Sequence, residues 1–207
     1  MVKRGGPTLT ERRAEELRMT IAHKAVEIFV ADGDTSATVE RIANAAGIAT
    51  RTFYRHFAVK EDVVRPLFRH SSSLVIDTLR NAPEGGDTVG ILVAAWTSAM
   101  DDGVLSPFDR RLLTLIAESP QYRLRWLEAD DDLCEAVAEF LAKQLGREEH
   151  PLRVTLPAYL VVQATRHVFM QWVATGTDEE IADLLRVGLS MVLDGVTAGL
   201  PAGAARG

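Results

Sequence analysis

The stretch from Thr38 to Asp62, TVERIANAAGIATRTFYRHFAVKED, decides the fold of this chain. In its first part, apolar residues recur at i, i+3, i+4 and i+7, the spacing of one buried helical face. These residues are Val39, Ile42, Ala43 and Ala46. Thr38 is suited to cap the N-terminus of this helix, because its side-chain oxygen can accept from an unsatisfied backbone N–H. Gly47 follows the last apolar position, where a left-handed residue commonly ends a helix.

A second helix is predicted directly after this glycine turn. Ile48, Phe53 and Phe57 continue the apolar pattern, whereas the positions between them are small and polar, cationic or tyrosine. Two helices joined by a tight glycine turn, the second one polar and basic on its outer side, are typical of a helix-turn-helix that reads DNA.

The segment resembles the DNA-binding domain of the tetracycline-repressor (TetR) family of bacterial transcriptional regulators. Roughly residues 18–69 fit the family pattern without a gap, including an upstream helix that closes on Gly33. The matching positions are Thr38, Ile42-Ala43, Ala45-Ala46-Gly47-Ile48, Thr52-Phe53-Tyr54, His56-Phe57 and Lys60-Glu61. Two positions depart from the pattern: Ala49 replaces the usual serine, and Arg51 replaces a glycine or small residue. These departures leave the fold intact but bear on which bases are read.

The second helix has the length to lie in the major groove. Arg51 is predicted to contact a base, because a guanidinium can donate two hydrogen bonds to guanine. Tyr54, His56 and Lys60 are better suited to phosphates, which set the register of the protein on the duplex. The resemblance implies phosphate contacts for Tyr54 and Lys60. The predicted DNA-binding residues are Thr38, Thr50, Arg51, Thr52, Tyr54, Arg55, His56 and Lys60.

The net charge of −6 is unevenly distributed over the 207 residues. Residues 1–70 hold 12 Lys and Arg against 9 Asp and Glu, whereas residues 71–207 hold 11 against 20. The basic character is therefore local, as expected if only the N-terminal part meets DNA. No apolar run approaches the roughly 18 residues of a membrane span. With no signal-like N-terminus and a single cysteine, Cys134, the composition favours the cytoplasm.

Helical patterns continue to the end of the chain, and no period-two stretch argues for a strand, so the predicted fold is all-α. Besides the two helices of the helix-turn-helix, helices are expected at Thr10–Ala31, Lys60–Arg80, 87–101, 108–118, 121–145, 152–175 and 178–198. Pro66 is expected to distort the first turns of the helix at Lys60–Arg80. The predicted division is a disordered tail (1–10), a DNA-binding domain (11–60), a connecting helix (61–80), a ligand-binding and dimerisation domain (81–200) and a flexible tail (201–207).

A single helix-turn-helix makes few contacts with DNA. Two copies are therefore expected, related by a two-fold axis on a palindromic operator. The last two helices are the predicted dimer interface, and the resemblance implies a four-helix bundle between two copies. The interface residues predicted are Val161, Val168, Trp172, Leu185, Leu189, Val192 and Leu193. The alternative is that these residues form ordinary core within one chain.

The second half is also expected to hold a small-molecule pocket that is mainly apolar with a few polar groups. Its predicted lining is Trp96, Met100, Phe108, Leu112, Trp126, Tyr159, Gln163, Arg166, His167 and Met170. Arg166 beside His167 suits an anionic head group, although such residues more often form a satisfied interhelical pair or face solvent. A lipophilic or acyl-type effector is the resulting hypothesis.

The sequence thus predicts a ligand-responsive transcriptional regulator, a repressor that a small molecule releases from DNA. A DNA-binding regulator without a small-molecule ligand, or an activator, stays open as an alternative. An enzyme is not expected: the chain lacks zinc-protease, di-iron and phosphate-loop motifs, and no cofactor or metal is implied.

Overall fold

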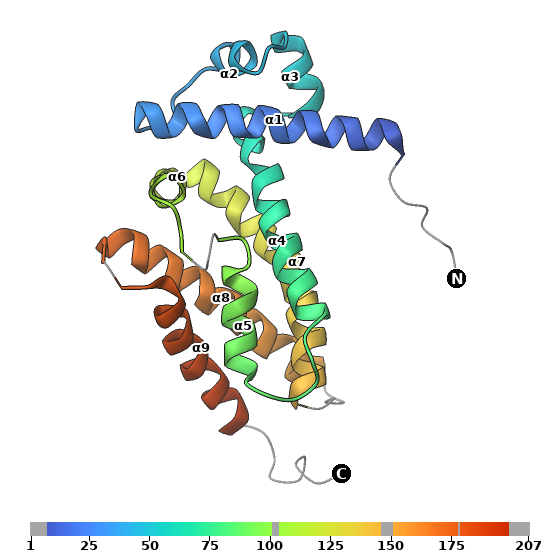
Figure 1. Ribbon diagram of the computed structural model, residues 1–207, viewed down its shortest axis with the longest axis vertical. Helices are drawn as coiled ribbons and strands as arrows, with labels where there is room; N and C mark the ends of the chain where they lie inside the picture. Colours follow the sequence, from blue (N-terminus) through green and yellow to red (C-terminus); the bar gives the residue numbers. More distant parts are fainter. Residues whose placement is uncertain (1–7, 101–103, 146–150, 178, 199–207) are drawn as a thin grey trace. The chain divides into compact units, whose positions relative to one another are not determined.

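The computed structural model describes residues 8–100, 104–145, 151–177 and 179–198. These residues form nine α-helices, one 3-10 helix and no β-strand (Figure 1), which confirms the all-α prediction. Contacts divide the chain into two compact units. The first contains residues 1–70 together with Arg111–Trp126, and the second contains Ser71–Arg110 and the chain from Leu127 onward.

The N-terminal unit is built around α1 (Leu9–Asp32), on which α2 (Val39–Ala45) and α3 (Thr50–His56) pack side by side (Figure 1). Its core combines apolar side chains of these helices with Leu115, Ile116 and Tyr122, which come from a distant part of the sequence. Phe29 meets Tyr122 edge to face, with ring centroids 5.4 Å apart. Each large side chain buried in this way contributes about 1.5–3 kcal/mol.

Most helix boundaries lie within one residue of the prediction; the exceptions are the start of the fourth helix, the helix expected at 87–101, which ends at Thr97, and the start of the last helix. Thr8 caps α1 in a reciprocal capping box with Glu11, so residues 8–10 are ordered although a tail was predicted for 1–10; residues 1–7 lie outside the described chain. Gly33 ends α1 at φ 76°, a left-handed conformation that favours glycine. The predicted fourth helix begins as a 3-10 helix, η1 (Lys60–Val64), and becomes α4 (Arg65–Arg80) where Pro66 occupies the first turn. Proline is tolerated there because the first N–H groups of a helix have no intrahelical partner.

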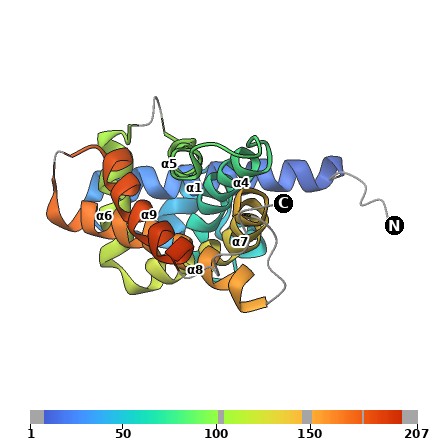
Figure 2. The ribbon, with the colours of Figure 1, turned by 90° about the horizontal axis from the view of Figure 1, so that it is seen from below.

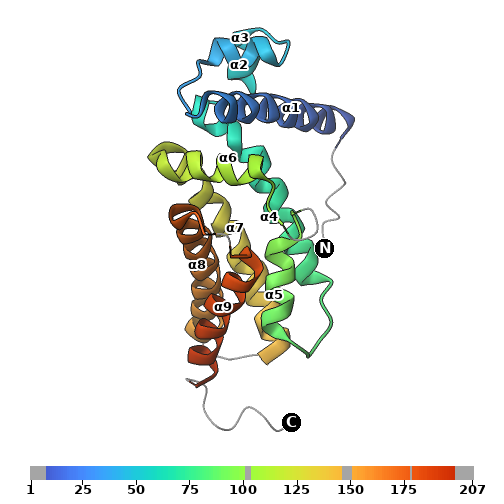
Figure 3. The same cartoon turned by 60° about the vertical axis from the view of Figure 1, so that its left-hand side comes forward.

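The second unit is assembled from α5 (Thr88–Thr97), the start of α6 (Pro107–Glu118), most of α7 (Pro120–Leu145), α8 (Pro151–Thr175) and α9 (Ile181–Ala198). In Figures 2 and 3, α9 runs beside α8 and is also flanked by α5. A Cβ built on Gly188 of α9 would lie 2.8 Å from a methyl group of Val168, so this close approach of α9 to α8 requires a glycine. The predicted tail at 201–207 lies outside the described residues.

The start of α9 differs from the expected residue 178. The helix begins at Ile181, and the carbonyl of Glu180 accepts from the N–H groups of Asp183 and Leu184. None of the described helices is long and apolar enough to cross a membrane.

Candidate nucleic-acid interface

Local capping sets the geometry of the two short helices. Thr38 Oγ1 accepts from the N–H of Arg41 at 3.3 Å, which confirms Thr38 as the cap of α2. Gly47 follows at φ 67°, and the N–H of Ile48 donates back to the carbonyl of Ala43 at 3.0 Å. Ala49 at the start of α3 provides no side-chain cap. A hydroxyl there would typically add about 0.5–2 kcal/mol, so α3 depends on its packing for stability.

Two phenylalanines anchor α3 and leave its other side open. Phe53 is fully buried, and its ring lies 5.1 Å from that of Phe57, which is also buried. Arg51 and Arg55 are both exposed, and no partner within the described chain holds either guanidinium. Tyr54 is 52% exposed and touches Phe53 only edge-on, whereas Thr50 and Thr52 are half-buried. The predicted reading side of α3 is therefore accessible, with two arginines on it.

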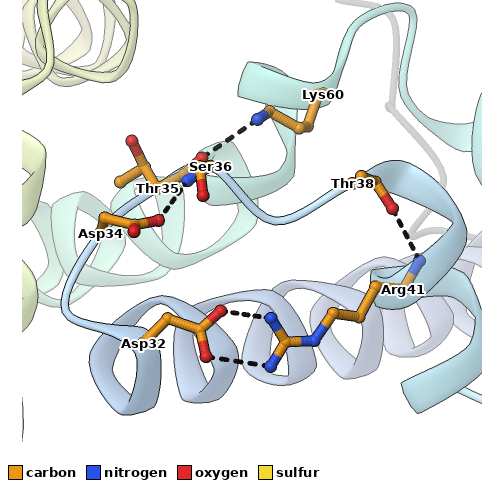
Figure 4. A network of polar contacts seen from close by, with 7 residues as sticks. All are labelled: Asp32, Asp34, Thr35, Ser36, Thr38, Arg41 and Lys60. Atoms are coloured by element: carbon orange, nitrogen blue, oxygen red, sulfur yellow. Dashed lines mark hydrogen bonds and ion pairs between the residues drawn. The ribbon is translucent and has the colours of Figure 1, made fainter.

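A polar network braces the loop between α1 and α2 (Figure 4). Arg41 forms a two-pronged ion pair with Asp32, in which Nη2 donates to Oδ1 at 2.9 Å. Asp34 accepts from the N–H of Ser36 at 2.7 Å, and this hydrogen bonding lowers the pKa of the Asp34 carboxyl. These contacts hold the loop that leads into α2, so they fix the helix-turn-helix of α2 and α3 to the end of α1.

Lys60 belongs to the same network. Its Nζ donates to the carbonyl oxygen of Thr35 at 3.0 Å, joining the start of η1 to the loop (Figure 4). An ammonium group has three N–H donors, so one bond to a carbonyl leaves donors for a phosphate. Lys60 thus has a structural role that the sequence did not indicate.

His56 differs from the other predicted DNA contacts. It is half-buried at the end of α3, and its Nε2 is enclosed without a hydrogen-bond partner. Burial lowers the pKa of His56, and the positive charges of Arg18 and Arg55 lower it further. The ring is therefore neutral at pH 7.

The predicted pocket residues are distributed over both units. Leu112 and Trp126 pack on the core of the N-terminal unit, where the Trp126 ring stacks on Phe68 at 6.1 Å. The other eight belong to the second unit. Of these, Trp96 is buried, whereas Phe108, Tyr159 and His167 are exposed, and Met100, Gln163, Arg166 and Met170 are half-buried. The pattern of aromatic residues alone does not define one cavity.

Arg166 forms an interhelical pair. Its Nη1 lies 3.1 Å from Asp130 Oδ2 on α7, and its Nη2 donates to the side-chain oxygen of Gln163. Asp130 is only 7% exposed, and burial raises the pKa of its carboxyl to about 6 although Arg166 acts in the opposite direction. Sequence reasoning missed Asp130, because it lies 36 positions from Arg166 within a run of acidic residues.

A second arginine clamps the turn between α8 and α9. Arg110 lies over the ring of Trp172, 4.0 Å from its centroid, and donates to the carbonyl of Thr177 at 2.6 Å. The indole N–H of Trp172 donates to the carbonyl of Glu179 at 2.9 Å. Neither contact could be read from sequence spacing.

The residues predicted for the dimer interface need correction. Val161, Trp172, Leu185, Leu189 and Leu193 are buried within a single chain, and Val168 and Val192 are half-buried. The five buried side chains are covered by their own chain and not exposed for a second copy, whereas Val168 and Val192 stay partly accessible. The large apolar side chains that α8 and α9 do expose are others: Leu152, Leu156, Tyr159 and Leu160 on α8, and Val187 and Met191 on α9.

The N-terminal unit is thus a helix-turn-helix of the DNA-binding type. Residues 21–67 match the family described as bacterial regulatory proteins, tetR family, and residues 89–197 match the MftR C-terminal domain. The chain belongs to the TetR family and is a transcriptional regulator.

Similar proteins agree with this assignment. The HTH-type transcriptional regulator TcmR of Streptomyces glaucescens is 28% identical over 148 residues, which cover 68% of this chain and 66% of TcmR. FadR of Thermus thermophilus, a TetR-family transcriptional repressor solved in complex with lauroyl-CoA, superposes with a TM-score of 0.62 at 21% identity, covering 92% of this chain and 98% of that one. FadR of Bacillus subtilis, solved with stearoyl-CoA, gives 0.61 at 20% identity, covering 86% and 98%. At these identities the two structures demonstrate a shared fold.

Proposed function

We propose that this protein is a repressor that binds a palindromic operator as a homodimer and leaves it when a small lipophilic or acyl-type molecule binds. The observation that carries the DNA-binding part is α3, anchored by buried Phe53 while Arg51 and Arg55 stay exposed without internal partners. In functional terms, residues 11–60 read DNA, 61–80 connect, and 81–200 bind the effector and the second copy.

The dimer surface of this proposal consists of the exposed apolar side chains of α8 and α9. Leu152, Leu156 and Tyr159 recur at i, i+4 and i+7 on α8, and Val187 and Met191 at i and i+4 on α9, so each set lies on one helical face. Val187 is 60% and Met191 73% exposed in the single chain. Exposed apolar residues gathered on two neighbouring helices mark an interaction surface, and a second copy would cover them.

A double substitution tests the dimer. Val187→Glu with Met191→Glu should give monomers in sedimentation and lose tight operator binding, because half-sites about 34–36 Å apart need two readers. Leu124→Glu is the matched control, since Leu124 is also an exposed apolar residue but lies on α7 in the other unit. An unchanged mass for the double variant would place the interface elsewhere.

The effector proposal draws on the relatives, whose structures hold lauroyl-CoA and stearoyl-CoA. Arg166 is already engaged by Asp130 and Gln163, so the head group of an acyl effector must displace Asp130 or find other partners. Thermal melting with fatty acids, acyl-CoA thioesters and unrelated lipophilic compounds tests this: an effector should raise the melting temperature and also release operator DNA.

If no compound does both, the regulator works without a small-molecule ligand. In vitro transcription from the operator-bearing promoter distinguishes a repressor from an activator, because a repressor lowers transcript yield when the effector is absent.

A further inference from the structure

A small cleft in the N-terminal unit lies between α1, the end of α3, η1 and the start of α4. Its volume is about 300 Å³, and its polar lining comprises Glu15, Arg18, His56, Asp62, Arg65 and Arg69. A water molecule occupies about 30 Å³ in the liquid, so the cleft has room for a polyatomic ion. The predicted DNA-reading residues Arg51, Tyr54 and Arg55 are not part of this lining.

The charges around the cleft leave positive charge in excess. Arg18 Nη1 lies 2.6 Å from Glu15 Oε2, so the charges of this pair neutralise each other. Asp62 Oδ1 is shared by two arginines, with Arg65 Nε at 3.1 Å and Arg125 Nε at 2.8 Å. Arg69 is exposed on the next turn of α4 and adds a further cation. The lining of the cleft therefore holds three arginines, Arg18, Arg65 and Arg69, and two carboxylates, Glu15 and Asp62.

The imidazole of His56 completes the cleft. Its Nε2 is enclosed without a hydrogen-bond partner, and an unsatisfied buried polar atom is unfavourable until a partner arrives. The ring is neutral because burial and the cations Arg18 and Arg55 lower its pKa. A neutral imidazole can carry its proton on Nε2 and donate it. A bound anion would accept that hydrogen bond and balance the surplus of arginine charge.

We propose that this cleft binds one phosphate-type oxyanion through Arg18, Arg69 and His56. A guanidinium presents paired N–H groups that fit the oxygens of a phosphate, and Arg18 and Arg69 approach from two different helices. The bound anion ties α1 to α4. Its source is either a backbone phosphate of duplex DNA or a free phosphate compound, and the two are separated by experiment.

The first arm uses pyrophosphate and DNA-free protein. Against sodium chloride of equal ionic strength, pyrophosphate at about tenfold excess over its Kd should raise the melting temperature of the wild type by about 3–6 °C. Arg69→Gln should remove most of this rise, and His56→Gln should reduce it. Arg80→Gln is the matched control, because it removes the same charge from an exposed position of the same helix outside the cleft, and it should keep the rise.

The second arm measures affinity for operator and random duplex DNA as a function of salt. If DNA supplies the phosphate, Arg69→Gln weakens both duplexes equally and flattens the salt slope by about one, whereas Arg80→Gln does not. If a free phosphate compound is the ligand, the pyrophosphate effect depends on Arg69 but the salt slope does not. The proposal is overturned if Arg69→Gln and Arg80→Gln behave alike in both arms. This result would leave the proposed operator binding by α3 untouched.

Discussion

The arginines of α3 and two arginines of the second unit, Arg110 and Arg166, have opposite surroundings. Arg51 and Arg55 stand exposed on the reading helix, and nothing in the described chain holds them. Arg110 and Arg166, in contrast, are half-buried, one over Trp172 and the other against Asp130. Recognition is the role that we propose for the arginines of α3, because their partner must come from outside the chain. Arg110 and Arg166, which have internal partners, fix parts of the second unit to one another. Substitutions of the two kinds should separate DNA affinity from stability.

The largest expected effect is on stability, from Arg166→Ala. Removing one member of a buried ion pair leaves the other without compensation, and because Arg166 is partly exposed we expect a loss of about 2–3 kcal/mol in the free energy of unfolding. Urea unfolding at pH 8 and pH 5 measures it. The loss should be smaller at pH 5, because Asp130, with a pKa of about 6, then takes up a proton.

Arg153→Ala is the control for this variant, since Arg153 is exposed on the same helix. Adding Asp130→Asn to Arg166→Ala should recover part of the loss, because the lone carboxylate disappears. Equal stability of the two alanine variants would show that the pair contributes nothing, and the contrast between the two groups of arginines would fail.

The next effect is on DNA binding. Arg51→Ala should weaken binding to the native operator by about 1–3 kcal/mol and relax the base preference, with no change in the free energy of unfolding. Titration of specific and random duplexes, together with urea unfolding, measures both quantities. A loss of the same size on random DNA would refute a base contact for Arg51 and leave it a phosphate contact.

Arg51 and Arg166 also show where prediction from sequence succeeds and where it does not. The cap at Thr38, the left-handed Gly47 and the buried Phe53 are set by residues within a few positions, so spacing alone predicted them and left Arg51 on the outer side. The partner of Arg166 lies on another helix. Local periodicity carries no information about such a contact.

The prediction of the interface named residues that are mostly buried in the single chain, for a related reason. On α9, both the face with Leu185 and Leu189 and the face with Val187 and Met191 are apolar, so the periodicity does not say which one is buried in the chain. Trp126 was likewise assigned to the pocket, but it packs on Phe68 because Arg111–Trp126 folds into the N-terminal unit.

A smaller effect is expected from Lys60→Ala. Lys60 combines features of the exposed arginines of α3 and of the internally paired Arg110 and Arg166. Its ammonium has an internal partner, the carbonyl of Thr35, yet it is also a predicted phosphate contact. The variant should weaken operator and random DNA similarly, flatten the salt slope by about one, and lose about 0.5–1.5 kcal/mol of stability from the missing hydrogen bond. A loss of stability with an unchanged salt dependence of DNA binding would mean that Lys60 has only a structural role.

The smallest expected effect concerns the pH dependence of stability, to which His56 in the N-terminal unit and Asp130 in the second unit contribute with opposite signs. The folded state lowers the pKa of His56, so near pH 6 the unfolded chain binds more protons, and stability falls as the pH drops below about 6.5. The folded state raises the pKa of Asp130, so its contribution has the opposite sign and is lost as the pH rises from about 4 to 6. Urea unfolding between about pH 7.5 and 5.5 should therefore show less loss on acidification for His56→Gln than for the wild type, and more for Asp130→Asn. Shifts in the same direction for both variants would mean that one of these two groups titrates in surroundings other than those described.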